Sequence, residues 1–201
     1  MSLRRPPGYY RATAGSWWQW KTRMRNQLAS VTTGEYQVAV VRSSRLSAGE
    51  VEVISVVAAD ADRVWSEVIR FDGINAEFMP VMRMTSPRGW RDRSLEDVDP
   101  GQRLFRSWLL LFGVFPVDYD DIRLVEVGPG YRFLERSQMM SSSTWEHERV
   151  IEAVAPGTCR ISDRVRFTPR WRLLGPVLRW FVPRLFAHRH RQLRRRYSGP
   201  A

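Results

Sequence analysis

The hydrophobic and polar positions along the chain change period twice, and these changes outline its organised part. Val51–Val57 is rich in β-branched residues and predicts a strand. Asp60 follows at the N-cap of an expected helix whose apolar residues fall on one face. Gly73 is expected to end that helix, and Ile74–Met79 to form a second short one. The opening of this part is therefore a strand followed by two short helices.

The next hundred residues alternate between apolar and polar positions, which is typical of half-buried strands. Short turns rich in Pro and Gly separate the runs. Neighbouring strands are expected to be antiparallel, because a parallel crossover needs about a dozen residues or more. The strand candidates are Met82–Thr85, Arg103–Phe112, Val117–Val127, Tyr131–Gln138, Thr144–Val154 and Thr158–Phe167.

The last stretch returns to a helical period. Pro176 suits a first helical turn, whereas Pro183 lies inside the pattern and predicts a kink or a break one turn upstream. The whole order predicts an α+β fold: a curved antiparallel sheet of about six to seven strands wrapped round a long C-terminal helix, with two short helices after the first strand. The apolar stripe of the long helix consists of Leu174, Leu178, Val182, Phe186, His190, Leu193 and Tyr197.

Residues 1–49 show no sustained period and combine basic with aromatic residues. We expect a poorly ordered N-terminal extension, followed by a domain over residues 50–197 and a short tail over 198–201. Two functional interpretations of the extension stay open: an amphipathic segment on a membrane surface, or an arm that grips a partner. Tyr36–Arg42 is compatible with one short strand added at a sheet edge.

The net charge of +11 is unevenly distributed. Residues 1–49 carry +7, residues 50–169 carry −5, and residues 170–201 carry +9 without a single carboxylate side chain. This distribution argues against a uniformly basic nucleic-acid-binding domain, although not against a basic tail that touches phosphates.

The single cysteine, Cys159, excludes an intramolecular disulfide framework and lies in a strand-like run, where a small half-buried side chain is expected rather than a nucleophile. No apolar run approaches the roughly 20 residues of a membrane-spanning helix. Arg4 and Arg5 are followed by Pro6 and Pro7 instead of an apolar segment, so no secretory signal is expected. The resulting expectation is a cytoplasmic protein, with peripheral contact to a membrane as an additional option.

Eight segments, together with the order of elements, carry a likeness to a known family. They are Val56–Trp65, Phe71–Glu77, Met79–Pro80, Met82–Thr85, Trp145–Arg149, Asp163–Arg164, Pro169–Trp171 and His188–Arg191. With these segments the chain resembles the helix-grip fold of the START-like, Bet v 1-like (SRPBCC) superfamily, which includes polyketide cyclases and lipid-transport proteins, and within it an uncharacterised bacterial subgroup. The likeness covers about residues 50–197. It implies a cavity between sheet and last helix that takes an apolar small molecule, while such a fold does not fix a function.

Two neighbouring strands are expected to place polar residues on an otherwise apolar inner face. A tight turn at Pro156–Gly157 would pair Arg149 with Asp163, and His147 one pleat away would lie near Val165. One interpretation is the polar end of a ligand pocket, with His147 able to move a proton. The other is a buried structural ion pair. The candidate ligand-binding residues are Trp145, His147, Arg149, Asp163, Val165, Phe167 and Phe186.

Two further clusters contain residue types that can bind a metal ion, but their spacing favours simpler interpretations. Asp118 and Asp120 share a face, Asp121 points away from it, and three such carboxylates are more typical of a solvated strand entry than of a site. His188 and His190 lie two residues apart on a helix and therefore face different ways, and His190 fits a hydrogen-bonded histidine on the apolar stripe. We expect no metal and no cofactor.

The arginines of the last helix allow three interpretations. They can be a solvated face favoured by the helix dipole, a phosphate-binding tail, or a surface attracted to anionic lipid. The residues proposed for contact with an anionic membrane are Arg184, Arg189, Arg191, Arg194, Arg195 and Arg196.

The sequence thus favours a non-catalytic protein that binds or carries an apolar small molecule or lipid. A polyketide cyclase or dehydratase comes second, with His147 as the candidate base and Asp163 and Arg149 in support. A basic RNA- or ribosome-associated protein comes third.

Overall fold

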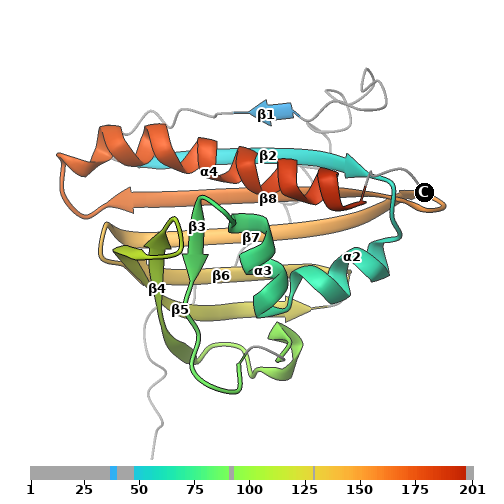
Figure 1. Cartoon of the computed structure of the whole chain (residues 1–201), viewed down its shortest axis with the longest axis horizontal. Helices are drawn as coiled ribbons and strands as arrows, with labels where there is room; N and C mark the ends of the chain where they lie inside the picture. Colours follow the sequence, from blue (N-terminus) through green and yellow to red (C-terminus); the bar gives the residue numbers. More distant parts are fainter. Residues whose placement is uncertain (1–36, 40–47, 91–92, 129, 198–201) are drawn as a thin grey trace, which may run out of the picture. The chain divides into compact units, whose positions relative to one another are not determined.

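In the computed structural model of the chain, eight strands form one antiparallel sheet in the order β1-β2-β8-β7-β6-β5-β4-β3 (Figure 1). The structure describes residues 37–39, 48–90, 93–128 and 130–197, all of them within one compact unit. The strands are β1 (Gln37–Ala39), β2 (Gly49–Val57), β3 (Met82–Met84), β4 (Arg103–Leu111), β5 (Phe115–Gly128), β6 (Arg132–Met139), β7 (Ser142–Ala155) and β8 (Thr158–Pro169).

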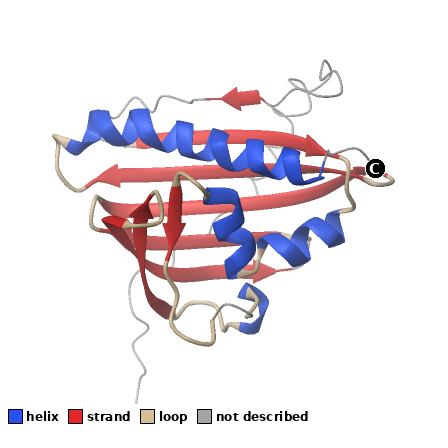
Figure 2. Cartoon of the chain, viewed as in Figure 1, coloured by secondary structure: helices blue, strands red, loops and turns tan. Residues whose placement is uncertain are grey.

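Among the described residues, three α-helices accompany the sheet, α2 (Ala61–Val68), α3 (Phe71–Phe78) and α4 (Leu174–Tyr197), together with a 3-10 turn at Leu95–Asp97. Figure 2 shows α2 and α3 in the connection after β2, and the much longer α4 lying along β2 and β8. The expected fold class is therefore confirmed: a helix-grip fold with a long C-terminal helix, seven main strands and two short helices after the first of them.

The core divides along α4 into two clusters. Val182, Leu185 and Phe186 in its first half pack with residues of β2, β7 and β8, whereas Leu193 and Tyr197 near its end pack with α2. Of the two alternatives expected at Pro183, the break is wrong, because α4 continues through this residue without interruption, and the kink stays a prediction. Burial of the apolar face on both sides of Pro183 stabilises the helix against the loss of one backbone donor.

The first helical segment differs from its prediction at both ends. Asp60 holds the N-cap position, but its carboxylate accepts a hydrogen bond from the backbone N–H of Gly157 at 3.0 Å instead of capping α2. Gly73 does not end a helix; it lies inside α3, where a Cβ atom would stand 1.9 Å from the carbonyl oxygen of Glu67. Glycine is needed there for the close approach of two helices rather than for termination.

The edge strand β1 lies within the short strand expected at Tyr36–Arg42, and it pairs with β2 through Val38 opposite Val53. The other residues of that expected strand, the remainder of the extension up to Ser47 and the tail 198–201 lie outside the described residues. The boundaries of the extension and the domain stay a prediction. None of the described helices is long and apolar enough to cross a membrane.

Candidate functional site

A cavity of about 500 Å³ lies between the sheet and the first half of α4. A volume of this size is within the usual range of small-molecule pockets. The wall is largely apolar, with side chains from α3, the strands β3 to β7 and α4. Among the residues on the wall are Phe78, Met82, Leu109, Ile122, Phe133, Met139, Leu178 and Phe181.

The pairing of β7 with β8 follows the register expected from the sequence. Arg149 stands opposite Asp163, and His147 stands opposite Val165. The side chains of Arg149 and Asp163 are fully buried and form the expected ion pair, with Nη2 of Arg149 2.6 Å from Oδ2 of Asp163. Of the seven candidate ligand-binding residues, Trp145, His147 and Phe186 reach the cavity wall. Arg149, Asp163, Val165 and Phe167 are buried behind that wall, not exposed to the cavity.

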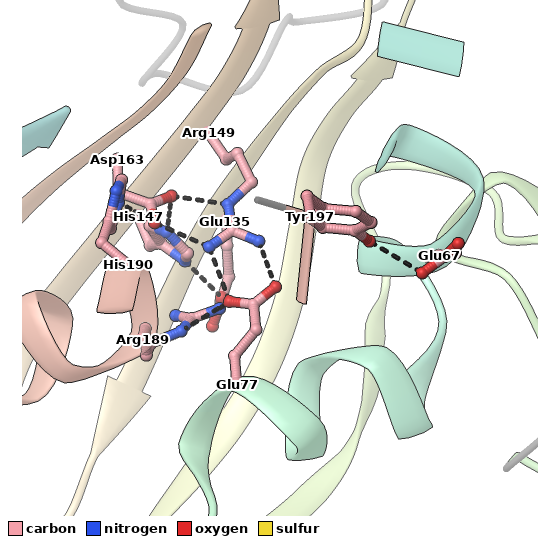
Figure 3. A network of polar contacts seen from close by, with 9 residues as sticks. All are labelled: Glu67, Glu77, Glu135, His147, Arg149, Asp163, Arg189, His190 and Tyr197. Carbon is pink, nitrogen blue, oxygen red and sulfur yellow. Dashed lines mark hydrogen bonds and ion pairs between the residues drawn. The ribbon is translucent and has the colours of Figure 1, made fainter. Parts of the chain in front are cut away.

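Arg149 is bound on two sides by carboxylates (Figure 3). Its Nε and Nη2 donate to Asp163 at 2.7 and 2.6 Å, and its Nη1 and Nη2 donate to Glu77 at 2.6 and 2.8 Å. Arg189 supplies a second guanidinium, whose Nε donates a hydrogen bond to the Glu77 carboxylate at 3.0 Å. Two arginines thus face two carboxylates, and the four formal charges cancel inside the protein. We call these four residues the buried network.

Two histidines complete the coordination of Asp163. His147 Nε2 lies 2.9 Å from Oδ1 and His190 Nε2 lies 3.0 Å from Oδ2. Burial lowers the pKa of His190, which is therefore neutral at pH 7, with Nε2–H donating to Asp163 and Nδ1 accepting from the Ser55 hydroxyl at 2.9 Å. The expectation of a hydrogen-bonded histidine on the apolar stripe is confirmed.

The carboxylates of the buried network are held ionised by their partners. Burial raises the pKa of Asp163, but the charge of Arg149 and the hydrogen bonds from Arg149, His147 and His190 outweigh burial and hold that pKa well below its usual range. Glu77 follows the same pattern, since Arg149 and Arg189 lower its pKa against the opposing effect of burial. The network therefore orients His147 from behind, and of its four residues only Arg189 reaches the cavity wall.

Glu77 and Arg189 were not recognised as members of this network. Arg189 is one of the arginines expected to face a membrane, and that expectation is wrong for this residue, because it is 3% exposed and paired with Glu77. The sequence carries a weak signal for both: Glu77 shares a helical face with the apolar Ile74 and Phe78, and Arg189 is adjacent to a stripe residue, His190.

The acidic cluster on β5 is also placed differently from its prediction. The face assignment is confirmed, since Asp121 points outward to Arg103 and Arg106 while Asp118 and Asp120 share the inner face with Ile122. The expectation that these carboxylates form a solvated strand entry is wrong for Asp118 and Asp120, because these residues are 8% and 4% exposed and line the cavity. Donors from the adjoining β6–β7 turn, such as Ser141 N–H, compensate Asp118 for the loss of water.

Cys159 behaves as the sequence predicts. It is fully buried in β8, and burial raises the pKa of its thiol to about 11. A thiol with such a pKa holds almost no thiolate at neutral pH, which agrees with the expected packing role of this side chain.

The replacement Asp120→Asn is expected to raise the free energy of unfolding at pH 7. Burial and the neighbouring Glu135 carboxylate raise the pKa of Asp120 well above its ordinary range, so the folded state binds this proton more tightly than the unfolded state does. Wild-type stability therefore falls as pH rises above the unfolded pKa, whereas asparagine carries no such proton. Urea unfolding measured between about pH 4 and pH 7 checks the difference in slope.

Asp121→Asn on the same strand is the matched control, with the opposite sign. Hydrogen bonds from Arg106 lower the pKa of Asp121 to about 2, so this carboxylate contributes stability above pH 3.8 and its loss lowers stability at pH 7. A lower unfolding free energy at pH 7 in both variants would contradict the raised pKa of Asp120.

Comparison with known proteins adds the following. A family model described as a domain of unknown function (DUF8410) matches residues 55–197. No curated protein matches the chain. Among solved structures, the protein CV1439 from Chromobacterium violaceum is similar with a TM-score of 0.58 and 12% identity, over 75% of this chain and 99% of that one.

A START superfamily protein from Mycobacterium smegmatis is similar with a TM-score of 0.53 and 13% identity, over 74% of this chain and 97% of that one. Protein Ms6760 from the same organism reaches a TM-score of 0.53 at 13% identity, over 76% and 92% of the two chains. At such identities the likeness concerns the fold alone, and in that respect the resemblance to START-like proteins is confirmed.

Proposed function

The chain belongs to the DUF8410 family, and from this premise we propose that it binds or carries an apolar small molecule or lipid in the cavity between its sheet and α4. One observation carries the proposal: a volume of about 500 Å³ whose wall is apolar except for a few polar groups. Burial of apolar ligand surface against such a wall is favourable at roughly 25 cal/mol per Å², and the polar groups fix orientation. The START-like fold of the chain agrees with this use of the cavity.

Titration with diphenylhexatriene, a neutral apolar dye that fluoresces when shielded from water, tests the proposal. The purified protein is expected to bind one dye molecule per chain with saturation, and decanol is expected to displace it. A fluorescence that rises linearly without saturation, or that decanol leaves unchanged, would mean that the cavity does not admit such molecules.

A cyclase or dehydratase activity is the second candidate, and the position of His147 favours it. This ring lies on the cavity wall with Nε2 2.9 Å from the buried Asp163, the arrangement of a histidine oriented to accept a proton at its other nitrogen. His147→Gln is expected to abolish turnover of an aromatic polyketide substrate while the dye still binds. Unchanged turnover in this variant would eliminate His147 as the base.

For a carrier, we propose peripheral contact with an anionic membrane through the exposed side of α4. Arg184, Arg191, Arg195 and Arg196 are exposed, and Arg184 lies over the ring of Trp180 at 4.4 Å. Arg196 also forms an ion pair with Glu67. Trp171, Leu173, Val177 and Trp180 add exposed apolar side chains at and before the start of the helix.

Co-sedimentation with vesicles that contain phosphatidylserine is expected to fall steeply as salt rises, since each arginine near an anionic surface contributes about 1 kcal/mol and salt screens this attraction. Replacing Arg184, Arg191 and Arg195 together by glutamine is expected to abolish binding at low salt. Replacing the outward-facing Arg103, Arg106 and Arg136 of the sheet provides a control of equal charge. Equal loss in both triple variants would show a non-specific effect of net charge.

A further inference from the structure

Three carboxyl groups gather at one part of the cavity wall: Asp118 and Asp120 on β5, and Glu135 on β6. Asp118 is satisfied by the chain itself, accepting from the N–H groups of Tyr119 at 2.8 Å and Ser141 at 3.2 Å and from the Ser141 hydroxyl. Glu135 accepts from the Ser137 hydroxyl at 2.5 Å, and its second oxygen lies 3.9 Å from Nδ1 of His147. Figure 3 shows Glu135 beside His147.

Asp120 differs from its two neighbours because one of its oxygens is unpaired. Its side chain lies on the cavity wall and is 4% exposed, yet Oδ1 has no hydrogen-bond partner among the described residues. Leaving a buried polar atom without a partner costs about 1–3 kcal/mol, and most such atoms in proteins are paired. Because Asp120 is one of the residues that line the ligand-sized cavity, a donor on a bound ligand is a candidate partner for this unpaired oxygen.

The charge around this oxygen indicates what kind of donor fits. Arg189 is the only arginine on the described part of the cavity wall, and both of its contacts with Glu77 commit it to the buried network. Because that network is neutral as a whole, it does not offset the charge of Glu135 and Asp118. The polar part of the wall is therefore negative, in surroundings where low polarity strengthens electrostatic interactions.

We propose that the cavity binds an apolar ligand that carries a protonated amine, with the ammonium group between Oδ1 of Asp120 and the carboxylate of Glu135. This inference rests on the proposed binding of apolar molecules. An ammonium group brings three donors and a positive charge, so it satisfies Oδ1 and offsets the charge of Glu135 in one contact. The aromatic rings of Trp145, Phe133 and Phe105 on the wall also favour a cation over an anion.

A neutral alcohol offers one donor and no charge, and a carboxylate would add a negative charge to a negative wall. Ligands that share one apolar chain and differ only in their head group therefore distinguish a site for an amine from a site for an alcohol or a carboxylate. The raised pKa of the buried Asp120 agrees with the same assignment, because a nearby cation favours the ionised form of a carboxyl group and so lowers that pKa again.

The test compares decylamine, decanol and decanoate as competitors of bound diphenylhexatriene at pH 7. Decylamine is expected to bind at least about tenfold more tightly than decanol, the difference of one charge-assisted contact, and decanoate is expected to bind most weakly. In Asp120→Asn the preference for the amine over the alcohol is expected to fall below about threefold. Glu135→Gln is expected to reduce the preference in the same direction.

Asp121→Asn, one residue along β5 but facing outward, is the matched control and should retain the full preference. Equal displacement by the three competitors, or a preference for decanoate, would overturn the amine inference while the proposed binding of apolar molecules stands. Absence of both dye binding and displacement would overturn the two together. A preference that survives in Asp120→Asn and Glu135→Gln would overturn the assigned position of the ammonium group.

Discussion

Replacement of Arg149 by methionine is expected to lower the free energy of unfolding by about 3–5 kcal/mol, because it breaks a buried ion-pair network on one side only. The guanidinium of Arg149 makes four hydrogen bonds to Asp163 and Glu77 and is completely shielded from water. Methionine fills a similar space but leaves Asp163 without an arginine, at a position where water cannot replace the lost contact. Urea unfolding monitored by tryptophan fluorescence measures the loss.

Arg136→Met provides the control. Arg136 pairs with Glu146 on the outer surface of the sheet with half of its side chain exposed, and exposed pairs contribute less than about 1 kcal/mol. Equal losses in the two variants would contradict the structural importance of the buried network. An Arg149→Lys variant is expected to recover only part of the loss, since an ammonium group cannot make the two-pronged contacts on both sides.

The second large effect concerns the cavity. Leu178 is half-buried on α4 and its side chain forms part of the cavity wall. Leu178→Trp is expected to fill the cavity and weaken the binding of diphenylhexatriene at least about 100-fold, since a ligand then has to displace a packed indole ring. Fluorescence titration measures the affinity, and the unfolding midpoint shows whether the variant is folded.

Arg191→Trp adds the same ring on the exposed side of the same helix and is expected to leave dye affinity within about threefold of the wild type. A folded Leu178→Trp variant that binds the dye as tightly as wild type would show that the dye binds elsewhere. Equal weakening in both variants would point to a general effect of an added tryptophan on α4.

The pairing of Arg149 with Asp163 was accessible from the sequence because it depends on local information. The Pro156–Gly157 turn fixes the register of β7 and β8, and the alternation of apolar residues identifies the inner face. Glu77 was missed for the opposite reason: it lies 72 residues from Arg149, and the contact depends on how α3 packs on the sheet. Gly73 added to the difficulty, since a glycine that permits close packing resembles one that ends a helix.

The sequence wrongly predicts exposure for several charged residues that the fold removes from water. Aspartates and arginines are exposed in most proteins, so Asp118, Asp120 and Arg189 were expected at the surface. In the structure the chain provides partners for Asp118 and Arg189, whereas one oxygen of Asp120 has no hydrogen-bond partner among the described residues. The positive charge of the last segment is consequently smaller at its surface than its sequence suggests.

The most direct test of the proposed function locates the bound molecule by its effect on methionine methyl groups. Met82, Met84, Met139 and Met140 contribute to the cavity wall, whereas Met79 lies outside it. In a spectrum of protein labelled at the methionine methyl carbons, saturating diphenylhexatriene is expected to shift the signals of the wall methionines through the ring currents of its phenyl groups and to leave Met79 in place. If the methyl signals of the wall methionines do not shift, whether or not that of Met79 does, the result would contradict the cavity as the binding site.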